Sequence, residues 1–556
     1  MVFIDWLVII VWVVGTSVFG MYFKKYVKST KDYLLAGRSL RWWQIAMAQA
    51  ADAVDATDFV ATSGQGLRTG LSQIGYAWWG MGIGTLLLSR YIAPLLYKSG
   101  VYTNAEYLEL RFNVALRVTS AMVQVLYRFV AMALVVYAMA TMFNVIIGIN
   151  LWYGVWASMG LTLLYVLEAG QLGVVMAAVP QMILMIFIAL VIFFSAGMEI
   201  GGWEGFMKHA AEFGNHLHLT GYSEPEVPGG IYVWGLILTL ITYPIVNQTV
   251  AQRIVGARSV VDARKGTVAS LIPWFLITGC SVIVGIMAMV LLPELKDGSA
   301  DSVYPLYMLR YLPPGMLGLG MAALMLASMS TGAGVGTAIA GLMTVDIYKR
   351  FCKSEPSDEY CLKLTRIFAA SSIICGTLFA MGIPHFGGMI PFYVAFTGTF
   401  FLPLTVPYVG GALYKHASRG SGLASVIGGV IAGAFLFLGK EYLPVWLGHP
   451  QWRPFWVLGM SWICFFLWSM VENKLKGIIP QNELASALNF SLLGRADTPE
   501  ELKKTIESLQ VPPWEGKKNL DYNQMGVPVN LCWYSNPTTF EIAVLIFLLV
   551  LMIWWW

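Results

Sequence analysis

Residues 42–65 read WWQIAMAQAADAVDATDFVATSGQ, and the only charged residues in this stretch are Asp52, Asp55 and Asp58. An aspartate near the middle of a membrane helix costs roughly 2.5–3.5 kcal/mol on insertion scales, so three together need partners, water or protons. Residues three apart advance about 300° around a helix, so the three carboxylates share one face. The stretch therefore predicts a membrane-embedded helix that carries a functional site.

The whole chain has the composition of a polytopic membrane protein. It has 556 residues, of which 57% are hydrophobic and 12% are charged. Several segments have eighteen or more residues with almost no charge, which is enough to cross a bilayer as a helix. We therefore predict an all-α membrane protein with about fourteen transmembrane helices. The predicted spans lie near residues 3–23, 42–65, 70–97, 115–148, 151–167, 173–198, 230–251, 265–293, 316–343, 365–382, 387–414, 421–438, 452–472 and 538–556.

Lysines and arginines concentrate in alternate loops, and this bias indicates the orientation of the chain. The loop after the first span has one acid, Asp32, against the basic residues Lys24, Lys25, Lys28, Lys31, Arg38 and Arg41. Basic loops stay in the cytoplasm, whereas loops of the opposite parity are acidic, for example around Glu294 and Asp301. We expect a multi-pass protein of the plasma or inner membrane with both the N-terminus and the C-terminus outside.

Breaks within spans locate the site, because irregular backbone is tolerated at membrane depth only where it lines a cavity. The candidates are Ala50–Thr57, which is poor in strong helix formers, Thr242–Asn247 with its internal Pro244, and the glycine-rich residues 330–341. The first two begin two five-span blocks of opposite orientation, as in secondary transporters, although proline and glycine packing could also cause unrelated kinks. This division predicts an extra helix and loop at 1–41, a first repeat at 42–199, an extracellular loop at 200–228, a second repeat at 229–414, peripheral helices at 415–473, a cytoplasmic segment at 474–537 and a last helix at 538–556.

Five groups of residues carry a resemblance to a known family. They are DYLLAGRSL at 32–40 followed by WW at 42–43, YT at 102–103 with EY at 106–107 and RFN at 111–113, NQ at 247–248 with QR at 252–253, ASMST at 327–331, and VDIYKR at 345–350. In this order and spacing the chain resembles the sodium/solute symporter family, which includes sodium-coupled sugar, proline, sialic acid and monocarboxylate carriers. The resemblance implies a LeuT-type core of five plus five inverted helices, with peripheral helices at both ends.

The resemblance also implies one sodium site. In the family, backbone carbonyls of the first core helix and a carbonyl with two hydroxyls on the eighth bind the ion; the matching residues here are Ala51, Val54, Ala327, Ser330 and Thr331. The alternative is that Ser330 and Thr331 only allow close helix packing. Relatives with a further sodium site have an acidic residue where this chain has Ala178, so we expect one Na⁺.

The substrate site departs from that of the family's galactose carrier. The positions that hold sugar hydroxyls there correspond to Asp58, Ala77, Gly80 and Trp274, so a glutamate, a serine and a lysine are missing. Carboxylates beside aromatic walls suit a cationic solute, and a hydroxyl-rich solute is the other candidate. The predicted substrate-binding residues are Asp55, Asp58, Trp78, Tyr243, Asn247, Gln248 and Tyr393.

The three aspartates admit three interpretations. They bind a cationic or hydroxyl-rich substrate, they titrate and couple transport to protons, or they pair with a basic side chain such as Arg68 or Arg128. Asp52 lies between the two expected sodium carbonyls, so we assign Asp52, together with Asp55, a role in ion coupling or proton binding.

The function that follows is sodium-coupled symport of a small polar organic solute by alternating access. Proton-coupled symport and a transporter-like solute sensor are the alternatives. We expect no enzymatic activity, no nucleic-acid partner and no metal beyond sodium; the expected partners are the solute and the lipid bilayer. His216 and His218 could touch a metal, but we interpret them as residues of a solvated loop.

Overall fold

The computed structural model describes residues 1–26, 30–222, 229–295, 300–352, 356–386, 389–477 and 536–555. Within these ranges the chain is helical, and a single isolated β-bridge joins Leu40 to Ala257. Nine of the described helices are long and apolar enough to cross a membrane, or ten if one bent pair counts as a span. The chain is therefore an all-helical, multi-pass membrane protein.

The first half of the chain forms nine helices. Their bounds are α1 Phe3–Tyr22, α2 Thr30–Leu35, α3 Trp42–Ala53, α4 Ala56–Thr69, α5 Ser72–Leu87, α6 Ala93–Lys98, α7 Asn104–Arg111, α8 Val114–Ile147 and α9 Leu151–Glu199. Two short helices follow in the predicted extracellular loop, α10 Gly202–Lys208 and α11 Ala210–Phe213.

The second half contains the remaining helices. Their bounds are α12 Gly229–Val246, α13 Gln248–Val255, α14 Val260–Ala269, α15 Leu271–Leu291, α16 Val303–Tyr311, α17 Met316–Gly341, α18 Asp358–Ala380, α19 Met389–Phe396, α20 Thr405–Leu413, α21 Ser421–Leu438, α22 Val445–Gly448, α23 Arg453–Lys476 and α25 Pro537–Trp555. Most of the predicted cytoplasmic segment at 474–537 lies outside the described residues.

The helix of the three aspartates is broken within the predicted interval. α3 ends at Ala53, Val54 and Asp55 are extended, and α4 begins at Ala56. The Asp55 carboxylate caps α4 by accepting a hydrogen bond from the Thr57 N–H at 2.6 Å, and Asp58 accepts from the Asp55 N–H at 3.1 Å. The break is stable because these side chains satisfy amides that have no partner within the helix.

The second break also lies where the sequence predicts it. α12 and α13 meet at Asn247 with a bend of 40°, and the Asn247 side chain accepts hydrogen bonds from the N–H groups of Thr249 and Val250 at 2.9 and 3.4 Å. The third predicted irregularity is wrong: α17 is continuous through its glycines to Gly341, and a π-helix follows at Leu342–Lys349. The glycines allow close packing instead, for example of Gly334 against Asp52.

One predicted loop is helical. The sequence EAGQLG at 168–173 was expected to separate spans at 151–167 and 173–198, but it lies inside the single helix α9. Glutamate, alanine, glutamine and leucine all favour helix, so a short polar stretch of this composition does not end one. This helix and the broken segments account for part of the difference between the predicted number of spans and the number of long apolar helices among the described residues.

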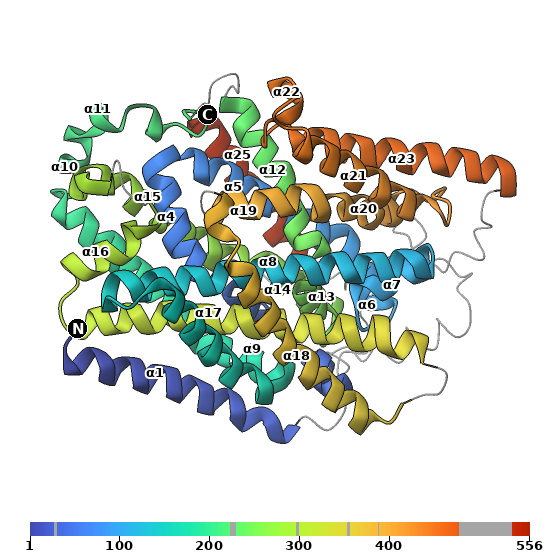
Figure 1. Cartoon of the computed structure of the whole chain (residues 1–556), viewed down its shortest axis with the longest axis horizontal. Coiled ribbons are helices and arrows are strands. Elements are labelled where there is room, and N and C mark those ends of the chain that lie inside the picture. The colour runs from blue at the N-terminus through green and yellow to red at the C-terminus, as the bar shows by residue number, and fades with distance from the viewer. Residues whose placement is uncertain are drawn as a thin grey trace.

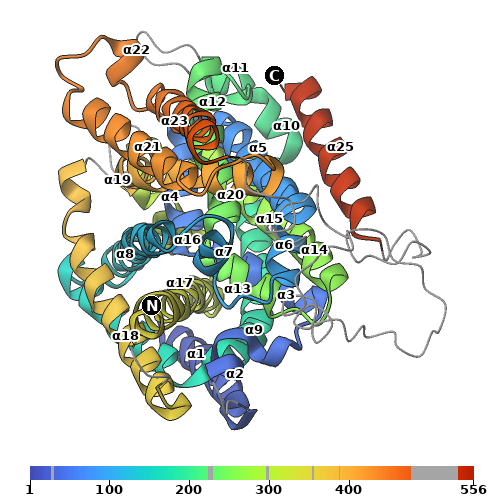
Figure 2. The same cartoon turned by 90° about the vertical axis from the view of Figure 1, so that its right-hand side faces the viewer.

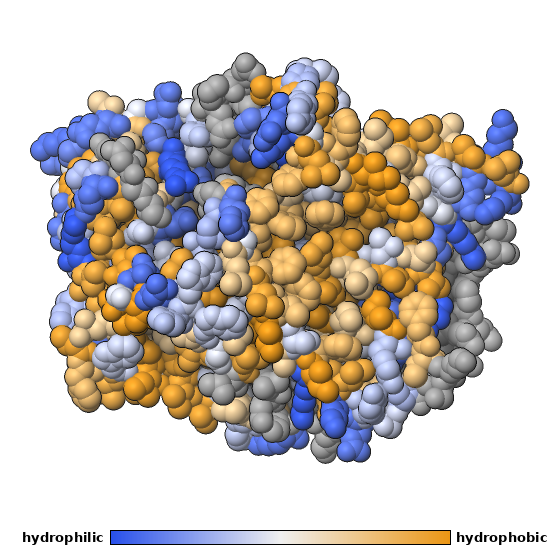
Figure 3. Space-filling model, in the orientation of Figure 1, coloured by the Kyte–Doolittle hydropathy of each residue, from blue (hydrophilic) through white to orange (hydrophobic). Residues whose placement is uncertain are grey.

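The long helix α17 lies in the middle of the bundle. It packs against α1, α8, α9 and α18, as the two views in Figures 1 and 2 show, and nearly all of its residues are buried. α25 packs at the periphery against α5 and α14. Apolar side chains cover much of the face shown in Figure 3, as expected for a surface in contact with lipid. The breaks in α3/α4 and α12/α13 are thereby enclosed by long, continuous helices.

Candidate functional site

A cavity of about 170 Å³ lies beside the two helix breaks. We call it the central cavity. It is lined from α3, α4, α5, α8, α12, α15, α17 and α19. Of the predicted site residues, it brings together Asp52, Asp55, Asp58, Tyr243, Thr331 and Tyr393. Ligand pockets for drug-sized molecules are commonly about 300–1,000 Å³, so this volume suits a small solute.

Three predicted substrate residues do not line the cavity. Trp78 donates from its indole N–H to the Thr278 hydroxyl at 2.9 Å, and its ring stacks on Phe275 at 4.9 Å. Its neighbour Ala77 does line the cavity, and a helix turns by about 100° per residue, so Trp78 faces α15 instead. The structure therefore places the Trp78 ring between α5 and α15, outside the lining of the central cavity.

Asn247 and Gln248 serve the backbone around the second break. The side-chain oxygen of Asn247 caps α13 and also accepts a hydrogen bond from the Arg128 guanidinium. The Gln248 side-chain oxygen accepts from the Asn104 N–H at 2.9 Å, in the segment that enters α7. The side-chain oxygens of both residues thus bind buried protein partners, whereas their amide nitrogens have no hydrogen-bond partner among the described residues.

The residues expected at the sodium site lie on or next to α3 and on α17, and these two helices are in contact. The Thr331 hydroxyl donates to the Asp52 carbonyl at 3.2 Å. The Ser330 hydroxyl is buried without a hydrogen-bond partner among the described residues. Ala51 and Val54 lie where α3 ends, so their carbonyls are not all used within the helix, and Ala327 lies one turn before Thr331. Carbonyl and hydroxyl oxygens are the donors that hard cations prefer, so the residues present fit Na⁺.

Asp52 pairs with an arginine that differs from the two suggested by the sequence. A nitrogen of Arg253 on α13 lies 3.2 Å from the Asp52 carboxylate, and both side chains are almost completely buried. Arg68 is exposed at the end of α4, and Arg128 lines the central cavity beside Asn247 and Thr249. Arg253 belongs to the QR pair at 252–253, but its partner could not be identified before the two breaks were placed.

Asp55 and Asp58 face the cavity with no ion pair among the described residues. Asp58 also interacts with the indole of Trp274. Tyr127 and Tyr393 form an aromatic wall nearby, with ring centroids 6.3 Å apart. The cavity is therefore lined by three carboxylates, of which Asp55 and Asp58 have no ion pair among the described residues, and by one guanidinium and several aromatic faces. Such a lining can hold a solute with both hydrogen-bond donors and acceptors.

Sequence reasoning missed three polar lining residues, Thr62 on α4, Gln73 on α5 and Thr239 on α12. The Gln73 side chain accepts a hydrogen bond from the Tyr76 hydroxyl, which also lines the cavity. Gln73 lies three residues before this tyrosine in a largely apolar helix, and that spacing could have identified it.

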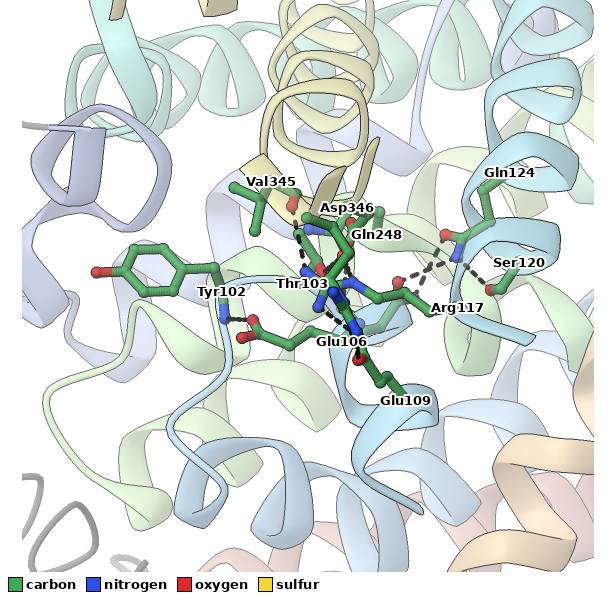
Figure 4. Close-up of polar contacts among 12 residues, drawn as sticks. Tyr102, Thr103, Glu106, Glu109, Arg117, Ser120, Gln124, Gln248, Val345 and Asp346 are labelled. Atoms are coloured by element: carbon green, nitrogen blue, oxygen red, sulfur yellow. Dashed lines mark hydrogen bonds and ion pairs between the residues drawn. The ribbon is translucent and has the colours of Figure 1, made fainter. Parts of the chain in front are cut away.

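A second polar cluster, buried around Asp346 and partly exposed at Glu109 and Arg350, connects α7 and α8 to the π-helix after α17 (Figure 4). We call it the Asp346 cluster; it consists of Thr103, Glu109, Arg117, Asp346 and Arg350. One Asp346 oxygen accepts from the Thr103 hydroxyl at 2.8 Å and from Arg117 at 2.6 Å. Glu109 accepts from Arg117 at 2.7 Å and from Arg350 at 2.9 Å. The YT, RFN and VDIYKR segments are therefore joined in space, because the first and last of them meet in this cluster and RFN directly precedes α8.

Comparison with known proteins gives a consistent result. A sequence profile of the sodium:solute symporter family matches residues 33–429. The sodium/glucose cotransporter of Vibrio parahaemolyticus is 27% identical over 434 residues, covering 74% of this chain and 80% of that protein. The human sodium/myo-inositol cotransporter is 25% identical over 477 residues, covering 77% of this chain and 65% of that protein.

A solved structure supports the fold. The structure of a Na⁺-coupled sialic acid symporter in its substrate-bound, outward-open state aligns with a TM-score of 0.71 at 20% identity. The alignment covers 84% of this chain and 98% of that one. At this identity the likeness shows a shared fold and leaves the solute open.

Proposed function

The chain belongs to the sodium:solute symporter family, and on this premise we propose that it drives the uptake of a small hydroxyl-rich solute with sodium by alternating access. Sodium-coupled symport itself follows from the family, and the protein is a transporter rather than an enzyme. The observation that carries the finer proposal is the central cavity, which opens beside two broken helices. Broken helices at matching positions of two repeats are where secondary transporters bind solute and ion.

We propose that a single sodium ion binds the carbonyls of Ala51, Val54 and Ala327 and the hydroxyls of Ser330 and Thr331. The Ser330 hydroxyl, which has no hydrogen-bond partner within the described ranges, supports this assignment, because a buried hydroxyl without a partner costs about 1–3 kcal/mol. The Asp52–Arg253 pair holds the end of α3 next to α13, so Asp52 acts on the ion through backbone position.

A hydroxyl-rich solute suits the cavity better than a cationic one. Hydroxyl groups both donate and accept, so they match the acceptors Asp55 and Asp58 and the donors Arg128 and Trp274. A cation would meet the carboxylates but also the positive charge of Arg128. Two relatives are named as carriers of glucose and myo-inositol, which are solutes of this class. Tyr243 and Tyr393 would bound the solute on its aromatic side.

The test is radiolabelled uptake into proteoliposomes that contain the purified protein. Candidate solutes are first screened by thermal shift in sodium, since a ligand at about 100 times its Kd adds about 2.7 kcal/mol of stability. We expect polyols and sugars to shift the protein, and the uptake of the best one to stop when sodium is replaced by N-methylglucamine. Shifts by quaternary amines alone would contradict the proposed solute class.

Proton coupling is the second candidate, because Asp55 and Asp58 share the cavity without an ion pair among the described residues. Neighbouring carboxylates of this kind can hold a proton. Uptake that persists without sodium, follows an imposed pH gradient and is lost in Asp58→Asn would favour this alternative.

We also propose the finer architecture that the sequence predicts. A straight helix of the 49 residues of α9 would extend about 74 Å, more than twice the roughly 30 Å hydrocarbon core. We therefore infer that α9 turns back within its length and that its two parts each cross the membrane. Counting each broken segment as one span then gives about fourteen, with repeats at 42–199 and 229–414. Both termini lie outside in this arrangement, and cysteine labelling at the two ends of intact cells tests it.

A further inference from the structure

A second hollow lies on the outside of the bundle, between α1, the beginning of α3 and α9. Its volume is about 490 Å³, nearly three times that of the central cavity. Its walls include Trp12 and Phe19 on α1, Trp43 on α3 and Pro180 on α9. The only hydroxyl among its lining residues, that of Thr16, donates to the Trp12 carbonyl at 2.8 Å. The surface of this groove is therefore almost entirely hydrocarbon.

The groove opens toward the bilayer. Val11 on α1 and Ile183 on α9, which both line it, are 60% and 55% exposed. Both helices contain candidate membrane spans, so lipid surrounds these side chains. A Cβ added to Gly15 would meet no atom within 4 Å. The α1 wall is thus open at its centre, and an elongated hydrocarbon can lie against it.

Basic residues stand at one end of the groove. Phe19, near the end of α1, and Trp43, at the beginning of α3, line the same groove, so these two helix ends lie together. Lys25 is exposed, with its ammonium 3.7 Å from the centre of the Tyr22 ring, in a turn that packs against α9. Its charge is therefore held near the wall of the groove.

Arg41 stands at the same end. The Gln44 side chain accepts from the Arg41 N–H at 2.8 Å and donates to the sulfur of Met176 at 3.1 Å. Met176 lines the groove, and so does Trp43, two residues after Arg41. The Arg41 backbone is thus tied to the groove wall, while its side chain is exposed and has no ion pair within the described part of the chain.

We propose that this groove binds a phospholipid with an anionic headgroup, with an acyl chain between α1 and α9 and the phosphate near Lys25 and Arg41. Basic pockets at the ends of membrane helices bind anionic headgroups, and each lysine or arginine contributes about a fivefold gain in affinity. Zwitterionic lipids would gain the hydrocarbon contact and little of the charge. The lipid would hold α1 against α3, and the proposal does not depend on which solute is carried.

The experiment is native mass spectrometry of the purified full chain titrated with phosphatidylglycerol or phosphatidylcholine. We expect one tightly retained phosphatidylglycerol. In Lys25→Ala with Arg41→Ala its affinity should fall by roughly fivefold for each charge. Lys474→Ala removes an exposed lysine at the end of another predicted span, α23, and should leave retention unchanged.

A steric variant tests the groove itself. Gly15→Phe should fill the open wall and abolish the tight site for either lipid, while Val14→Phe, at a 53% exposed position outside the lining, should not. Gel filtration and solute uptake show that both variants fold. Equal retention of the two lipids by the unmodified protein, or full phosphatidylglycerol retention in folded Gly15→Phe, would overturn the proposal.

Discussion

The Asp346 cluster and the central cavity both place buried carboxylates near arginines, but they use their polar atoms differently. In the cluster, one Asp346 oxygen accepts from Thr103 at 2.8 Å and from Arg117 at 2.6 Å. At the cavity, Asp52 lies 3.2 Å from Arg253, yet within the described ranges neither of its oxygens has a hydrogen-bond partner. The cluster makes short hydrogen bonds between helices, whereas the cavity retains capacity for a ligand.

This difference indicates which contacts between helices can rearrange during transport. Charge-assisted hydrogen bonds of 2.6–2.9 Å fix the orientation of both partners, so the cluster joins α7 and α8 firmly to the end of α17. A looser pair next to a cavity can exchange its partner for water, an ion or solute as the transporter moves. The predictions below test whether stability resides in the first region and transport in the second.

The largest expected effect is on the stability of Arg117→Leu. This change leaves the completely buried Asp346 without its arginine, which costs about 3–5 kcal/mol of unfolding free energy. Arg253→Leu should cost less, because Asp52 lies 3.2 Å from Arg253 and, among the described residues, makes no hydrogen bond that would be lost. Unfolding of the detergent-solubilised proteins measures both, and an equal loss would remove the distinction between the two regions.

The next effect is that of Gly334→Ala. A Cβ at Gly334 would collide with the Asp52 carboxylate, and overpacking of this kind costs about 1–3 kcal/mol. Uptake should fall as well, because Asp52 would move away from Arg253. Gly459→Ala in α23 is the matched control: its new methyl group meets nothing within 4 Å, so it should leave uptake intact. Normal uptake by Gly334→Ala would show that the Asp52 position is not critical.

A smaller effect on stability with a clear effect on transport is expected for Thr331→Val. Loss of the bond to the Asp52 carbonyl costs about 0.5–1.5 kcal/mol, and the sodium concentration for half-maximal uptake should rise up to about tenfold. Thr344→Val removes a similar buried hydroxyl that does not line the cavity and is hydrogen-bonded to the Thr365 hydroxyl at 3.1 Å. It should cost similar stability and leave sodium dependence unchanged; the same sodium dependence in both variants would contradict the ion assignment.

The sequence predicts the helix breaks better than it predicts the contacts between distant helices. The breaks near Asp55 and Asn247 could be predicted because local chemistry determines them: both residues cap the helix that follows. The partner of Asp52 could not be predicted, since Arg253 is 201 positions later and the two meet only when both breaks are placed. The place of Trp78 outside the cavity lining could not be predicted either, because an aromatic residue fits a solute cavity and a helix interface equally well, and only the rotation of α5 distinguishes them.

The smallest effect concerns the exposed edge of the Asp346 cluster, where Glu109 lies in α7, outside the candidate spans. Burial raises the pKa of Glu109, but hydrogen bonds from Arg350 and Arg117 outweigh it and lower the pKa below the ordinary value of 4.5. A lowered folded-state pKa means that the unfolded chain binds the proton more tightly. The stabilisation is therefore present above the unfolded pKa and is lost as pH falls through the folded one.

Glu109→Gln should accordingly lose about 1 kcal/mol or less at neutral pH and show a shallower fall in melting temperature below pH 4.5. Glu359 is an exposed residue of α18 with no ion pair in the described ranges. In Glu359→Gln the melting temperature should therefore fall with pH as steeply as in the unmodified protein. Because Glu109 is 19% exposed and its partner Arg350 is 38% exposed, salt should weaken the Glu109 contribution more than that of Arg117 with Asp346. An unchanged acid slope in Glu109→Gln would mean that the cluster draws its stability from the buried Asp346 pair alone.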